Sequence, residues 1–237
     1  MKNRDRIIRY YQGTDNGELA ARLIDLADSA AKGRPYAVSE FVSPGAVQIG
    51  ETIQAHAPAL VLRTFGGYQG AERVKLAFVS ADYDGPVDFN LTACRVKWDS
   101  RYRLLSHRDV LGSLMGLGIG RERFGDIIMQ DDGAILLADT ALLQYLKQNF
   151  TKVAMVSVTV EEMPLSDIAP RQEKVKEIKT TVASLRLDAV ASSGFGISRT
   201  KAAEAIKGDR VQVNWQPAKG PSQDVQEGDV ISLRGKG

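Results

Sequence analysis

The side chains of this chain that could act in catalysis or bind a metal are not spaced as they are in known catalytic or metal-binding motifs. His107-Arg108-Asp109 has the order of a protein-kinase catalytic loop, but that loop needs a metal-binding asparagine five residues after the aspartate, where this chain has Leu114. There are two histidines, His56 and His107, and one cysteine, Cys94, too few for a histidine-rich or cysteine-based metal site. We therefore expect no catalytic residues, no metal and no cofactor.

Two glycine-containing strings resemble ligand-binding loops but stand in the wrong context. Gly116, Gly118 and Gly120 follow a predicted helix, whereas a dinucleotide-binding turn follows a strand. The string from Gly67 to Gly70 has the GXXG form of KH domains, but it joins two predicted strands and not two helices. A simple turn between strands is therefore favoured at Gly67–Gly70.

An aromatic residue and three cations near this turn remain secondary candidates for RNA contact. Aromatic rings can stack on bases, and neighbouring cations can bind the phosphates of the same strand. The four residues are Arg63, Tyr68, Arg73 and Lys75.

Arg186-Leu187-Asp188 is the tripeptide in which pseudouridine synthases carry their catalytic aspartate. Ser192-Ser193-Gly194 even imitates the turn that follows the aspartate in those enzymes. However, residues 197–203 begin a second helix, and no folded catalytic half remains beyond it to receive the aspartate. We interpret Asp188 as structural, in a salt bridge or a helix cap, because a carboxylate would repel phosphate.

The strongest signal is the start of the helix predicted at about residues 199–207. Ser198 is a preferred N-cap residue, so backbone amides and the positive end of the helix dipole point to where Arg199 and Lys201 project. This arrangement predicts a seat for phosphate, which further cations of the segment would border. The predicted RNA-binding residues are Arg186, Ser198, Arg199, Thr200, Lys201, Lys207, Arg210, Lys219, Arg234 and Lys236.

Three regions are expected to position these residues. Residues 1–57 are predicted to be an N-terminal helical region, because apolar residues between Leu19 and Ala27 follow a 3.6-residue period. Residues 58–170 mix strands and helices, with a helix begun by a capping box of Ser106 and Asp109 and a hairpin around Asp131-Asp132-Gly133. This mixture predicts a central α/β sandwich. Residues 171–237 contain a linker, two short helices and small strands, so the whole chain is predicted to be α+β.

The charge of the chain is uneven. Residues 171–237 contain 12 Lys/Arg and 8 Asp/Glu, a net +4, and residues 1–170 contain the other 19 and 21, a net −2. A weakly basic tail is compatible with RNA binding but does not prove it. No apolar run approaches the roughly 18 residues of a membrane span, and no signal segment is visible, so we expect a cytoplasmic protein without a membrane partner.

The segment that starts at Leu185 closely resembles the S-four (alpha-L) RNA-binding domain. Arginine-leucine-aspartate opens the first helix, serine-arginine-threonine-lysine opens the second, and a glycine ends it. The strands that follow in that domain match Val211-Gln212-Val213-Asn214 and Gly228-Asp229-Val230-Ile231. The resemblance implies binding of structured RNA.

A wider resemblance covers nearly the full length. The chain is similar to the YlmH family of bacterial proteins, and to the cyanobacterial photosystem II S-four-domain proteins, in the strings Phe65-Gly66-Gly67-Tyr68, Ser106-His107-Arg108-Asp109-Val110-Leu111-Gly112 and Gly125-Asp126-Ile127-Ile128. The resemblance implies an RNA-recognition-like central domain. It also implies a factor that binds ribosomal RNA and tRNA on the large ribosomal subunit, in ribosome-associated quality control of stalled nascent chains.

The leading hypothesis is therefore a non-enzymatic RNA-binding protein with no small-molecule substrate. An alternative is an RNA-modifying enzyme in which residues 1–170 catalyse and the C-terminal module delivers the substrate. Another is an adaptor for the division or photosynthetic machinery.

Overall fold

The computed structural model describes residues 4–11, 16–99, 105–169 and 177–235 of the chain. The chain divides into two compact units, residues 1–172 and residues 173–237. The first unit contains two antiparallel sheets with helices, and the second contains two helices and a small sheet. The prediction of an α+β fold is confirmed.

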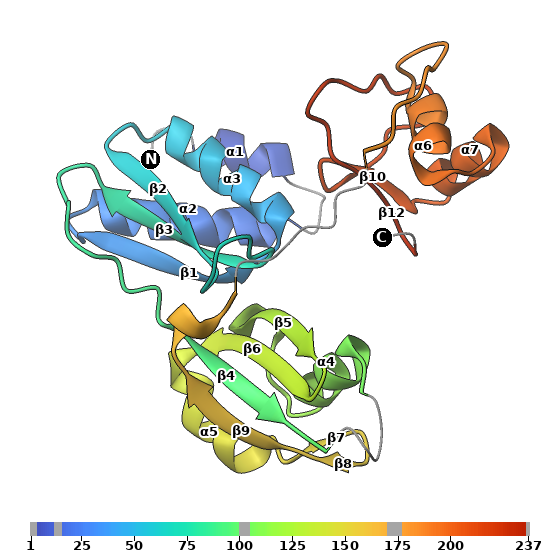
Figure 1. The fold of residues 1–237 in the computed structure, drawn as a ribbon. Helices are drawn as coiled ribbons and strands as arrows, with labels where there is room; N and C mark the ends of the chain where they lie inside the picture. Colours follow the sequence, from blue (N-terminus) through green and yellow to red (C-terminus); the bar gives the residue numbers. More distant parts are fainter. Residues whose placement is uncertain (1–3, 12–15, 100–104, 170–176, 236–237) are drawn as a thin grey trace. The chain divides into compact units, whose positions relative to one another are not determined.

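The N-terminal part of the first unit is a three-stranded antiparallel sheet covered by helices (Figure 1). The strand order is β1-β3-β2, and apolar side chains of the strands and helices form one core. The elements are α1 (Arg4–Tyr11), α2 (Gly17–Ala31), β1 (Tyr36–Val42), α3 (Pro44–Ala55), β2 (Leu60–Phe65) and β3 (Val74–Ser80).

The prediction that residues 1–57 are helical is wrong in one element, because β1 lies among them. β1 pairs with β3, so the predicted boundary between residues 57 and 58 divides strands of one sheet. The strand is held by long-range pairing, and its neighbour β3 is 32 residues or more further along the chain. A local helical period cannot reveal such a partner.

The segment between β3 and β4, residues 81–90, contacts the face of this sheet that the helices do not cover. The ring of Tyr83 lies 5.7 Å from that of Tyr36, and the ring of Phe89 lies 5.5 Å from that of Phe65. Arg63 Nη1 donates to the carbonyl of Gly85 at 3.3 Å. The segment therefore contacts the sheet through an aromatic ring near each end, and Arg63 donates a hydrogen bond to it between the two rings.

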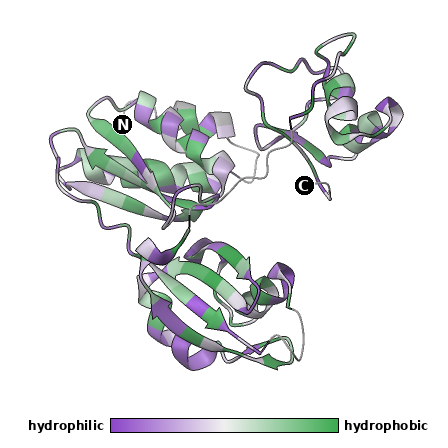
Figure 2. Ribbon diagram, viewed as in Figure 1, coloured by the Kyte–Doolittle hydropathy of each residue, from purple (hydrophilic) through white to green (hydrophobic). Residues whose placement is uncertain are grey.

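The central part is a four-stranded antiparallel sheet in the order β5-β6-β4-β9, with α4 and α5 packed against one face (Figure 1). The central strand of the first sheet, β3, and one of the two inner strands of the second sheet, β6, are largely apolar (Figure 2). The elements are β4 (Leu91–Lys97), α4 (His107–Met115), β5 (Phe124–Gln130), β6 (Gly133–Asp139), α5 (Leu143–Asn149), β7 (Lys152–Val153), β8 (Val156–Ser157) and β9 (Thr159–Met163).

Local signals place several of these elements. The Ser106 side chain accepts from the Asp109 amide and the Asp109 carboxylate accepts from the Ser106 amide, so the predicted capping box is confirmed. β5 and β6 form the hairpin predicted around residues 131–133. Cys94 is fully buried in β4, and burial raises the pKa of its thiol to about 11, which fits the role of a small core residue.

The second unit packs two short helices and a small antiparallel sheet around its own core. The strand order is β11-β10-β12. The elements are α6 (Leu187–Phe195), α7 (Arg199–Lys207), β10 (Val211–Val213), β11 (Gln216–Pro217) and β12 (Ile231–Leu233).

Candidate nucleic-acid interface

The start of α7 has the geometry that the sequence predicts. Ser198 has an extended backbone, and its hydroxyl accepts a hydrogen bond from the Lys201 amide at 3.2 Å. The remaining amides of the first turn have no partner within the helix, and the helix dipole is positive here. Arg199, Thr200 and Lys201 are all exposed in this turn. An oxyanion could therefore approach both backbone donors and cationic side chains.

Two of the predicted cations share one buried carboxylate. Asp188, in the first turn of α6, is only 6% exposed and accepts from Arg199 Nη2 at 3.0 Å and from Arg186 Nε at 3.4 Å. The hydrogen bond from Arg199 is the main reason why the pKa of Asp188 lies below its usual value. The side chains of Arg199 and Arg186 are still 53% and 41% exposed.

Asp188 therefore has the structural role that the sequence suggests. It neutralises part of the charge of two arginines, but it also fixes both guanidinium groups near the start of α7. Each guanidinium has five N–H donors, so donors remain for another acceptor. We call Arg186, Ser198, Arg199, Thr200 and Lys201 the helix-start group.

Three further cations lie at the other end of α7. Lys207 is in its last turn, and Arg210 begins the chain segment that enters β10. The Arg234 amide donates to the Arg210 carbonyl at 2.8 Å, which brings these two residues side by side. Lys207, Arg210 and Arg234 are exposed, and we call them the helix-end group. α7 has nine residues, so about 13 Å of helix separates this group from the helix-start group.

Lys219 is exposed in the loop after β11, and its amide donates to the Gln223 side chain at 2.8 Å. The same loop holds the start of α6, because the Leu187 amide donates to the Gln223 carbonyl at 2.8 Å. The loop of Lys219 is therefore hydrogen-bonded to the residue that follows Arg186. Lys236, the last predicted cation, lies outside the described residues.

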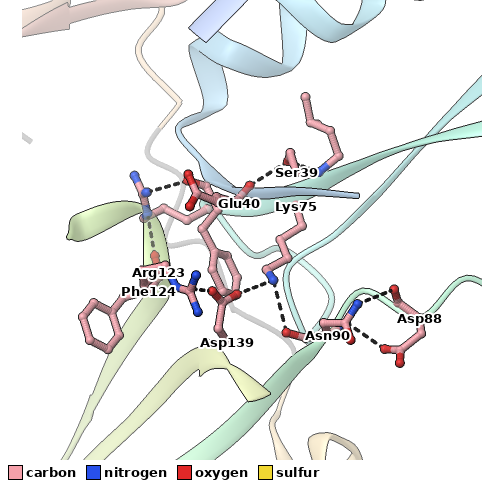
Figure 3. Close-up of polar contacts among 11 residues, drawn as sticks. Ser39, Glu40, Lys75, Asp88, Asn90, Arg123, Phe124 and Asp139 are labelled. Atoms are coloured by element: carbon pink, nitrogen blue, oxygen red, sulfur yellow. Dashed lines mark hydrogen bonds and ion pairs between the residues drawn. The ribbon is translucent and has the colours of Figure 1, made fainter. Parts of the chain in front are cut away.

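Three of the four secondary candidates, Tyr68, Arg73 and Lys75, have structural contacts in place of the predicted role. Lys75 is 4% exposed, forms an ion pair with Asp139, and donates to the Asn90 carbonyl at 3.1 Å (Figure 3). Its ammonium also lies 5.1 Å from the centre of the Phe41 ring. A buried, paired ammonium cannot bind a phosphate in solvent, so we remove Lys75 from the RNA-contact candidates.

Arg73 is used inside the protein in the same way. Its guanidinium donates to the carbonyls of Phe124 and Phe41, both at 3.0 Å. Burial of the guanidinium lowers its pKa, an effect that the nearby Asp126 opposes. Arg73 thus joins β1 and β5, and it too is removed from the candidates.

The loop between β2 and β3 is held by a carboxylate that the sequence does not single out. Asp126 on β5 accepts from the Tyr68 hydroxyl at 2.8 Å and from the amides of Glu72 and Arg73 at 2.8 and 3.0 Å. Gly67 has φ +97°, and a side chain there would meet Leu137 at 2.6 Å. The GXXG string is therefore a tightly packed loop between two strands. Of the four secondary candidates, only Arg63 is exposed.

Asp188 leads to a prediction about stability. Asp188→Asn is expected to lower the free energy of unfolding of the full chain by about 1–2 kcal/mol at pH 7, because the hydrogen bonds from two half-exposed arginines lose their charged acceptor. The pKa of Asp188 is depressed in the folded state, so its contribution is present above the unfolded pKa near 4 and is lost as the pH falls through the folded value.

Chemical denaturation of both proteins between about pH 2 and pH 7 measures this effect. The two curves should converge only at the acidic end. A constant difference down to the lowest pH would mean that the amide disturbs packing and that the charge is not the cause.

The described residues also bear on two other kinds of site, a membrane span and a metal centre. Among the described residues, no helix is long and apolar enough to cross a membrane. In the same part of the chain, no group of three or more histidine, cysteine and acidic residues is placed to hold a metal ion.

Comparisons with known proteins agree with the motifs. Residues 85–167 match the family described as the putative RNA-binding domain in YlmH, and residues 185–231 match the S4 domain. The chain is 37% identical over 174 residues to the Ribosome-associated protein quality control protein P2 of Bacillus subtilis (strain 168). The matched region covers 73% of this chain and 67% of that protein.

A solved structure shares the fold. The Cell division protein ylmH from Streptococcus pneumoniae matches with a TM-score of 0.53 and 20% identity, over 65% of this chain and 93% of that one. At this identity the likeness concerns the fold alone.

Proposed function

The chain belongs to the YlmH family of S4-domain proteins, and from this we propose that it binds structured RNA of the ribosome without catalysing a reaction. The observation that carries the proposal is the capped start of α7, where backbone donors and the side chains of Arg199 and Lys201 meet. Both matched families are RNA-binding domains, which supports a role in binding.

The expected partner is the large ribosomal subunit, with contacts to ribosomal RNA and tRNA. A relative named as a ribosome-associated protein quality control protein supports the ribosome as the partner, and the large subunit and tRNA are part of the proposal. In that role the protein would act in the cytoplasm on ribosomes with stalled nascent chains. It would need no small-molecule substrate and no cofactor.

The helix-start and helix-end groups suggest how one RNA strand would be held. About 13 Å separates them along α7, so they can bind phosphates that are not adjacent. Such contacts read the backbone and shape of the RNA and not its base sequence. The fold of the RNA would then supply most of the specificity.

Co-sedimentation of the full chain with purified ribosomal subunits tests the proposal. We expect binding to the large subunit at about 50 mM salt, and a logarithm of affinity that falls linearly with the logarithm of salt by roughly 0.7–0.9 for each phosphate contact. Equal binding to both subunits would contradict the choice of partner. Absence of binding to either subunit, and to their purified RNA, would contradict RNA binding itself.

A further inference from the structure

The turn between β10 and β11 has an unusual residue at its tip. β10 and β11 pair antiparallel with Val213 opposite Gln216, so Asn214 and Trp215 form a two-residue turn. Their φ angles are +51° and +60°. Two left-handed residues in succession are typical of a type I′ turn, where Asn-Gly is the favoured sequence. Trp215 therefore stands where glycine would fit with least strain.

The turn is fixed by Asn214 and does not need Trp215. The Asn214 side chain donates to Asp229 Oδ1 at 2.7 Å and accepts from the Val230 amide at 2.9 Å. Its own amide donates to the Val230 carbonyl at 2.8 Å. Asp229 accepts in addition from the Gln226 amide at 2.8 Å. This network holds Asn214 in place, and Trp215 follows it in the turn with φ +60°.

Trp215 lies outside the apolar core of the second unit. It is partly exposed, and it is not among the residues that form or line the apolar core of this unit. Among the described residues, its indole has no hydrogen bond and no contact with another ring or with a cation. Val230, bonded to the same turn, exposes 44% of its surface. A large aromatic side chain thus lies at the tip of the hairpin, partly exposed and outside the apolar core.

We propose that Trp215 is a stacking platform for an unpaired base of the RNA that the cationic groups bind. Bulky residues are held in left-handed conformations where the surroundings enforce them, and such positions concentrate at binding sites. An indole offers a flat π-face to any base, and its free N–H can donate to a base edge or a phosphate. The inference rests on the proposed function, because it names a second kind of contact to the same RNA.

The position of Trp215 suits one continuous RNA strand. Arg210 precedes β10 and Asn214 follows it, and a three-residue strand spans about 10 Å. The stacking residue and the helix-end group therefore lie at opposite ends of one short strand. Single-stranded sites of a few nucleotides commonly combine cations with aromatic rings over such lengths.

Tryptophan fluorescence provides a direct test, because the chain has two tryptophans and Trp98 is only 8% exposed. In the full chain with Trp98→Phe, addition of purified large-subunit RNA should quench the emission of Trp215. In the matched variant Trp215→Phe, the same RNA should leave the emission of Trp98 nearly unchanged. Equal responses of the two variants would overturn the proposal.

Affinity for the same purified RNA gives the second test. Trp215→Gly and Trp215→Leu should weaken binding roughly 5- to 150-fold, and Trp215→Phe should weaken it less, because loss of one stacked base has an effect of this size. The slope of affinity against salt should not change, since no phosphate contact is removed. Trp215→Gly should unfold at the same temperature as the original chain or a higher one.

The outcomes separate this inference from the proposed function. If the original chain binds the RNA and the three variants bind equally well, Trp215 is not a stacking residue, and RNA binding stands. If the original chain does not bind RNA, both proposals fail. If the variants lose association with whole subunits but keep full affinity for the naked RNA, Trp215 contacts a ribosomal protein and the stacking proposal is overturned.

Discussion

Replacing Arg199 and Lys201 together by alanine is expected to weaken binding to purified large-subunit RNA by about 25- to 60-fold at 0.1 M salt. The estimate follows from counterion release, since a slope of 0.7–0.9 per phosphate corresponds to about 5- to 8-fold for each lost contact at this salt. The slope itself should become shallower by roughly 1.4–1.8. Filter binding over a range of salt measures both quantities.

The double variant needs two controls. Lys32→Ala with Lys179→Ala removes the same charge from exposed positions outside the helix-start and helix-end groups, so it should change neither the slope nor the affinity by more than about 3-fold. Arg199→Ala also leaves Asp188 with Arg186 as its remaining hydrogen-bonded arginine. Addition of Asp188→Asn to the double variant removes the carboxylate that has lost one of its two arginine donors.

If the slope of the logarithm of affinity against the logarithm of salt stays unchanged in the double variant, the start of α7 is not part of the RNA interface. Thermal unfolding decides whether a weaker variant is simply less folded. A folded variant with the original affinity would leave the family membership intact and would require another RNA-binding surface.

Replacing Asp139 by alanine is expected to lower the free energy of unfolding by about 3–5 kcal/mol. Asp139 is 6% exposed and forms ion pairs with Lys75 and Arg123 (Figure 3). Without it, the charge of Lys75 stays buried, and among the described residues its remaining polar and ring contacts are the Asn90 carbonyl and the Phe41 ring. Removal of one partner of a buried pair leaves such a charge uncompensated, which is the main cost. Guanidinium denaturation measures the change.

The matched control removes both charges. Lys75→Met combined with Asp139→Leu should restore most of the lost stability, since well-packed apolar residues often replace a buried pair at no cost. Arg123 can then turn to water, because its side chain is 35% exposed. A double variant as unstable as Asp139→Ala would show that packing at this joint, and not the isolated charge, determines the effect.

The sequence by itself determined the elements that depend on near neighbours. The capping box of Ser106 and Asp109 involves residues three apart, and the cap of α7 at Ser198 does so as well. The two helices of the second unit and the hairpin of β5 and β6 were predicted for the same reason. Helix caps and hairpin turns are formed by a few consecutive residues, so their side-chain types are sufficient to indicate them.

Only the tertiary structure decided which cations face solvent. Arg73 and Lys75 are close to Tyr68 in sequence, but their partners belong to distant elements. Arg73 donates to the carbonyls of Phe41 and Phe124, and Lys75 pairs with Asp139. The strand β1 likewise depends on β3, and the turn that carries Trp215 is held by contacts of Asn214 with Asp229 and Val230. The fate of a charge or a strained residue depends on partners far along the chain, and a local pattern carries no information about them.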